Sequence, residues 1–181
     1  MDAEPRTRTL DTRDATLSRS ASNPRRTMPF SYALALGLHV LAAALWVGGM
    51  ATFHFAVRPA AVAALEPPLR LAFMAAALAR FFAAVTIAIV VLLASGATMI
   101  VLAGGMGAVK PHVHAMLALG LVMVALFAHV RFAPFPRLQR AVAARDAPAA
   151  KAALETIRKL VGVNLVLGTI VILVATLGRA F

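Results

Sequence analysis

Residues 81–109 read FFAAVTIAIVVLLASGATMIVLAGGMGAV, and none of them is charged. A helix that crosses a bilayer needs about 20 predominantly apolar residues. Lipid offers no hydrogen bonds to the backbone, so a single spanning segment must pair its own N–H and C=O groups, as a helix does. This stretch therefore predicts a transmembrane helix, with Arg80 at its entrance.

Three further apolar segments predict three more spans. The four expected spans cover about residues 29–57, 80–104, 112–133 and 158–179. These segments lack the polar face that a helix in a soluble bundle presents to water. The expected fold class is therefore all-α: an integral membrane, four-helix, up-and-down bundle.

The amino-acid composition also indicates a membrane protein. Of the 181 residues, 61% are hydrophobic and 14% are charged, whereas soluble domains are about half apolar and about a quarter charged. Cysteine is absent, which excludes disulfides, thiolate nucleophiles, iron–sulfur ligands and cysteine-type zinc sites. Any metal must be held by His, Met or oxygen ligands.

Residues 1–27 differ from the rest of the chain. They are rich in Arg, Ser, Thr and Asp and nearly devoid of large apolar side chains, which predicts a disordered tail. Met28 directly precedes the first apolar segment, so one interpretation is that translation starts there. The membrane domain is expected to cover residues 28–181.

The position of the charges explains the formal net charge of +11. The loops at 58–80 and 131–159 share one side of a four-span protein, and they hold ten Lys or Arg against three Asp or Glu, a net of +7. If the tail is discounted, the positive-inside rule places these loops in the cytoplasm and both termini in the periplasm. The excess charge then contacts anionic lipid headgroups, and nucleic acid is excluded as a partner.

The acidic residues all lie outside the apolar segments. This distribution excludes paired-carboxylate catalysis and sites for hard cations within the membrane. The Ser and Thr residues of the spans have no base and carboxylate arranged around them, so we expect no catalytic residue.

Histidine is the exception among the ionisable residues. All five lie within or at the ends of the first and third spans: His39, His54, His112, His114 and His129. An ionisable residue inside a membrane indicates function, although each of these side chains also fits a structural role.

The pairs His39/His54 and His114/His129 are each separated by 15 residues, about 22 Å along a helix. Two b-type haem groups, one bound by His39 and His114 and the other by His54 and His129, fit this layout. However, 15 residues leave a rotation of about 60° on a regular helix. One haem or metal at one end is therefore equally consistent.

Arginine and methionine residues extend these two hypotheses. Arg58, Arg80 and Arg131 are candidates for pairing with haem propionates, or else for anchoring at the membrane surface. Met50 and Met116 are soft ligands that suit copper, and the alternative copper site consists of His39, His112, His114, Met50 and Met116. Ordinary core packing is the other interpretation of the methionines.

The stretch LHVLAAALWVGGM, residues 38–50, resembles the first-span motif of the copper-resistance-D (CopD) family of bacterial membrane proteins. The resemblance covers about residues 30–178 and continues in Arg58-Pro59-Ala60, Arg80-Phe81-Phe82, Ser95-Gly96, His112-Val113-His114-Ala115-Met116 and Arg158-Lys159-Leu160-Val161-Gly162-Val163-Asn164. It implies a multi-span protein of the inner membrane associated with copper handling. The first-span motif is also distantly similar to the haem-binding protoporphyrinogen oxidase family of bacteria, which implies a redox role with His39 as a haem ligand.

The sequence therefore predicts a CopD-like protein of the bacterial inner membrane that binds b-type haem or copper. Its expected role lies in copper handling or membrane electron transfer, with a redox partner or a second copy of the chain as candidate partners. A copper permease and a non-catalytic scaffold with structural histidines are the alternatives.

Overall fold

The computed structural model describes residues 29–178. The predicted tail at 1–27 and the alternative start at Met28 lie outside the described residues. The chain divides into residues 1–30 and 31–181, and the packing reported below belongs to the second of these units.

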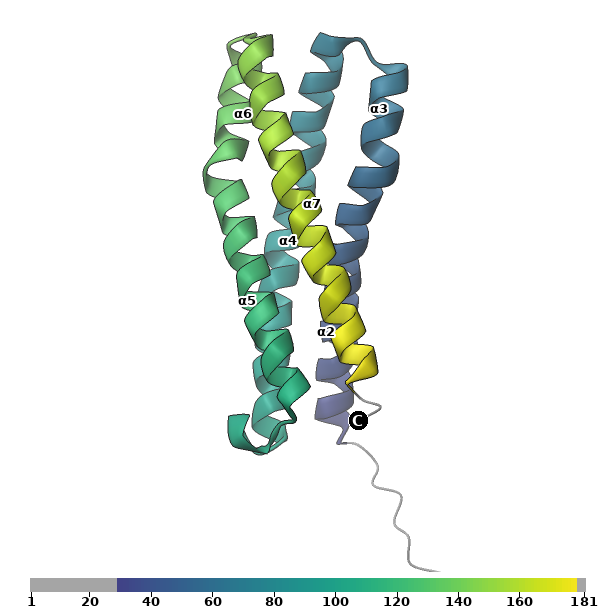
Figure 1. Cartoon of the computed structure of the whole chain (residues 1–181), viewed down its shortest axis with the longest axis vertical. Coiled ribbons are helices and arrows are strands. Elements are labelled where there is room, and N and C mark those ends of the chain that lie inside the picture. Colours follow the sequence, from purple (N-terminus) through teal and green to yellow (C-terminus); the bar gives the residue numbers. More distant parts are fainter. Residues whose placement is uncertain (1–28, 179–181) are drawn as a thin grey trace, which may run out of the picture. The chain divides into compact units, whose positions relative to one another are not determined.

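The described residues form four helices that are long and apolar enough to cross a membrane (Figure 1). Their bounds are Phe30–Ala64, Pro67–Leu102, Pro111–Ala143 and Ala147–Leu177. They run alternately in opposite directions, so the loops around residues 65 and 145 lie at one end and the turn around residue 105 lies at the other. The expected all-α, four-helix, up-and-down membrane fold is confirmed.

The first and third helices are each composite. The first consists of α2 (Phe30–Thr52), the π-helical turn η1 (Phe53–Val57) and α3 (Arg58–Ala64). The third consists of α5 (Pro111–Phe132) and α6 (Pro134–Ala143). Proline lacks a backbone N–H and disfavours a helical residue before it, which explains why the axis breaks at Ala133.

The second and fourth helices, α4 (Pro67–Leu102) and α7 (Ala147–Leu177), are continuous. At the start of α7, the Asp146 carboxylate accepts a hydrogen bond from the backbone N–H of Ala149 at 3.0 Å, which satisfies one of the free N–H groups of the first turn. The turn after α4 contains Gly104 and Gly105 at φ +99° and +91°, where a side chain would be strained. A short 3₁₀ turn, η2 (Met106–Ala108), then leads to α5.

Phe82 of α4 lies at the centre of the packing and is 1% exposed. Its ring meets Phe127 of α5 and Phe135 of α6 edge-on, with centroids 5.7 and 5.0 Å apart, the geometry that aromatic pairs prefer. A second cluster contains Trp46 and Met50 of α2 together with Val85, Ile89 and Met123. The two clusters connect all four long helices.

Large apolar side chains also cover the outside of the helices. Ile87, Val90, Leu121 and Val166 are among the many that are exposed. A water-soluble monomer rarely exposes contiguous apolar surface on this scale. The exterior of the helices therefore requires an apolar solvent, and the chain is a multi-pass membrane protein.

Adjacent glycines on α2 offer a test of this packing. A Cβ at Gly49 would overlap Cε2 of Phe81, whose ring is stacked on Phe53 with centroids 4.8 Å apart. We predict that Gly49→Ala lowers the free energy of unfolding by about 1–3 kcal/mol, because overpacking forces these rings apart. Thermal unfolding in mild detergent measures the change.

Gly48→Ala is the matched control, since nothing lies within 4 Å of a Cβ at Gly48. Its expected effect is a gain of about 0.5–1 kcal/mol, because alanine favours the helix and meets no neighbour here. Equal losses in the two variants would contradict the packing described for Phe81.

Candidate functional site

His39 is the histidine with the most specific polar contact. It lies on α2, and its Nδ1 is 3.0 Å from Oγ of Ser95 on α4. Ser95 is 6% exposed, so this contact ties two helices together inside the protein. The ring also lies against the next residue, Gly96: a Cβ there would lie 3.4 Å from Cε1 of His39, an ordinary van der Waals distance.

The hydrogen bonds of Ser95 determine which nitrogen of His39 carries the proton. Oγ of Ser95 lies 2.6 Å from the carbonyl oxygen of Val91 and 3.2 Å from that of Leu92. Carbonyl oxygens only accept, so the single hydroxyl proton is directed at the nearer one, that of Val91, and this arrangement favours Nδ1–H of His39 as the donor to Oγ. In a neutral ring, Nε2 then keeps its lone pair. Metal-binding histidines are typically oriented in this way, with the other ring nitrogen donating to a neighbouring group.

The remaining histidines have weaker or purely apolar surroundings. His54 lies in the π-helical turn, meets Phe55 edge-on at 4.9 Å, and has Cε1 3.9 Å from a Cβ position at Gly162 of α7. The side chain of His112 lies against Gly178 at the end of α7. His114 and His129 are exposed, and Nδ1 of His114 lies 3.4 Å from the carbonyl oxygen of Lys110.

None of these contacts joins His39 to His114 or His54 to His129. His39 contacts α4, whereas His54 and His112 contact α7. Within residues 29–178, no group of three or more His, Cys, Asp or Glu side chains is placed to hold a metal ion. A complete ligand set at His39 therefore requires methionine, the backbone or an external ligand.

The three candidate arginines differ in their surroundings. Arg58 lies 3.9 Å from Glu155 of α7, which also pairs with Arg158 at 2.7 Å. The guanidinium of Arg131 lies over the rings of Phe132 and Phe135 at 5.8 and 5.6 Å. Arg80 is exposed. Arg58 and His54 thus both contact residues of α7, Glu155 and Gly162.

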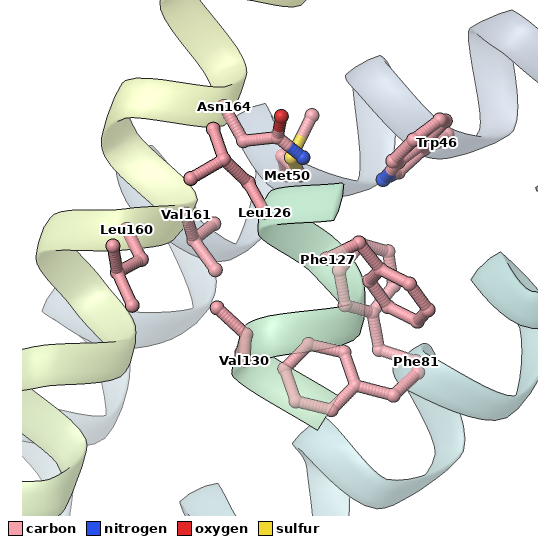
Figure 2. A pocket seen from close by; sticks show the side chains of 10 residues that line it. Trp46, Met50, Phe81, Leu126, Phe127, Val130, Leu160, Val161 and Asn164 are labelled. Atoms are coloured by element: carbon pink, nitrogen blue, oxygen red, sulfur yellow. The ribbon is translucent and has the colours of Figure 1, made fainter. Parts of the chain in front are cut away.

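The two candidate methionines lie far apart in the packing. Met50 is 2% exposed and lines an interior cavity of about 10 Å³ with Trp46, Phe127 and Asn164 (Figure 2). Among the described residues, Oδ1 of Asn164 has no hydrogen-bond partner. The cavity is about the size of one water molecule. Met116, in the second turn of α5, is half-buried.

Sequence reasoning had missed the parts played by Ser95 and Glu155. No spacing rule relates Ser95 to His39, which lies 56 residues away, so the sequence does not predict their contact. Glu155 and Arg158 stand three residues apart, a spacing that predicts a helical ion pair. That spacing gave no indication that Arg58 joins them.

The fold and these contacts define a polytopic helical membrane protein with a partly buried histidine between α2 and α4. The profile of the family described as Copper resistance protein D (CopD) matches residues 75–177, more than half of the chain. The chain therefore belongs to the copper resistance protein D family. Comparisons with curated proteins and with solved structures gave no match. The matched region contains Ser95, His112, His114 and His129, whereas His39 and His54 precede it.

The orientation of His39 leads to a spectroscopic prediction. In the wild-type protein, ¹⁵N NMR of labelled histidine should show the Nδ1–H tautomer for His39, assigned by the loss of its signals in His39→Gln. In Ser95→Ala the acceptor is removed, so we predict a shift of the population towards the Nε2–H tautomer.

Thr98→Ala serves as the control, because Thr98 lies one turn further along α4 and donates to the carbonyl of Ala94. It should leave the His39 signals unchanged. An Nε2–H tautomer in the wild type, or identical His39 signals in Ser95→Ala, would contradict the hydrogen-bond directions given above.

Proposed function

We propose that this chain is a copper-binding protein of the bacterial inner membrane that takes part in copper handling, with Nε2 of His39 as its principal ligand. The observation that carries the proposal is the 3.0 Å contact between Nδ1 of His39 and Oγ of Ser95. Membership of the copper resistance family supports copper as the metal. Imidazole nitrogen suits copper, and thioether sulfur suits its reduced form.

The further ligands are expected at the end of the bundle where α5 begins. His112, His114 and Met116 lie in its first two turns, and His39 lies in the third turn of α2, which starts at the same end. Met50 is 11 residues from His39 on one helix, about 16 Å along its axis. The two cannot bind the same ion, so Met50 belongs to the core or to a separate position.

The described cavities support copper better than haem b. A haem needs a space as wide as a porphyrin, with an axial ligand pointing into it. The interior cavity is about 10 Å³, and no histidine lines it. A larger open groove between α2 and α7 is also without a histidine. The residues that line these two places do not fit haem b.

The expected orientation places this end of the bundle at the periplasm. The basic loops at the other end follow the positive-inside rule and would contact anionic headgroups in the cytoplasmic leaflet. Copper would then reach His39 from the periplasmic side. A permease requires a continuous path to the opposite end, and the packed rings of Phe82, Phe127 and Phe135 lie across the middle of the bundle. This packing favours a copper acceptor over a permease.

Copper binding by purified variants tests the proposal. We predict that the protein in mild detergent binds copper(I) in competition with a chromophoric chelator, and that His39→Ala abolishes this binding. Ser95→Ala should weaken the affinity by about 10- to 100-fold, the usual cost of removing a group that orients a ligand. His114→Ala should weaken it if the start of α5 supplies a second ligand.

His129→Ala is the control, because His129 is exposed in the last turn of α5, at the opposite end. It should bind copper as the wild type does. A haem absorption band in protein from haem-replete cells, lost in His39→Ala, would overturn copper in favour of haem. If neither haem nor copper is bound after haem-replete and copper-replete expression, the protein is a non-catalytic scaffold with structural histidines.

A further inference from the structure

An open groove runs between α2 and α7 on the outside of the bundle. It has a volume of about 560 Å³. Its walls are apolar apart from one threonine, and they are formed by Ala44, Val47, Gly48, Ala51 and Phe55 on one helix and Leu165, Val166, Thr169 and Ile172 on the other. A Cβ at Gly48 would have no neighbour within 4 Å, so the glycine leaves the groove open at its middle.

A cluster of charges lies beyond the groove on the same two helices, towards the end of the bundle that carries the loops around residues 65 and 145. Arg158 precedes Leu165 by seven residues, or two turns, so it stays on the groove-lining face of α7. Arg58 follows Phe55 by three residues and contacts Glu155 on that same helix. Both arginines pair with Glu155, at 3.9 and 2.7 Å. Two cations thus share one anion, and the cluster keeps a net charge of +1 while its side chains remain partly exposed.

The length of the combined feature matches one leaflet of a bilayer. From Arg158 to Ile172 is 14 residues, or about 21 Å along α7. A bilayer including its headgroup regions is about 40–45 Å thick, so half of it is close to this length. An elongated molecule with an anionic end and an apolar chain fits the charge cluster and the groove together.

We propose that the groove and the Arg58–Glu155–Arg158 cluster form a binding site for one anionic phospholipid. The phosphate lies at the two guanidinium groups, and an acyl chain lies along Phe55, Ala51 and Gly48. This inference deepens the headgroup contact proposed above, and it is independent of copper. The net positive charge distinguishes the site from ordinary lipid-facing surface, where a zwitterionic lipid would do equally well.

Lipid retention by the purified protein tests the site. Native mass spectrometry in detergent, titrated with phosphatidylglycerol or phosphatidylcholine, should show one phosphatidylglycerol bound in preference to phosphatidylcholine. The double variant Arg58→Gln/Arg158→Gln should bind phosphatidylglycerol about tenfold more weakly. Gly48→Leu, which fills the groove without touching the charges, should also lose binding.

Arg137→Gln/Arg140→Gln is the matched control, because it removes the same charge from exposed positions of α6 at the same end. It should retain phosphatidylglycerol. An equal loss in the control would overturn this site while leaving a general attraction between headgroups and basic loops. Equal retention of phosphatidylcholine would also overturn the proposed site. A dimer that Gly48→Leu dissociates would overturn it as well, since a second copy of the chain would then occupy the groove.

Discussion

Lipid offers no hydrogen bonds, and the rest of the structure follows from this constraint. It forces each span to be helical, and it also governs the hydroxyl groups within the spans. Thr86 donates to the carbonyl of Phe82, and Thr169 to that of Leu165, each four residues back on the same helix. A hydroxyl satisfied locally needs no partner on another helix. Ser95 follows the same rule and, in addition, accepts from His39.

That second bond distinguishes His39 from the other polar groups of the bundle. An imidazole has two nitrogens and cannot satisfy both on one neighbouring group. Once Nδ1 donates to Ser95, Nε2 is left with a lone pair in a setting where protein acceptors and donors are scarce. The lone pair of a neutral imidazole nitrogen is the atom that binds a metal ion. The chemistry proposed for the protein thus arises from the same scarcity that shapes its fold.

The spans could be predicted from sequence because they are recognised by length and apolarity. Both can be read without knowing how the helices pack. The rotation of each helix could not. Apolar residues cover every side of α5, so its pattern does not indicate which side faces the core, and His114 and His129 prove to be exposed. In contrast, α6 is strongly amphipathic, and its apolar residues Phe135 and Leu138 are buried. The π-helical turn at Phe53–Val57 lies just before Pro59, yet a proline in a helix does not by itself indicate a π-helical turn.

The helices are also unequal in how closely their backbones approach. α7 packs extensively along α5 and α6, whereas α2 meets its neighbours mainly through single large side chains such as Trp46. When a bundle loosens, the element with the fewest contacts separates first. Movement of α2 away from α4 would break the bond between His39 and Ser95 and leave the α5–α6–α7 unit assembled. Opening of the bundle around His39 therefore requires the movement of one helix and leaves the rest of the domain folded.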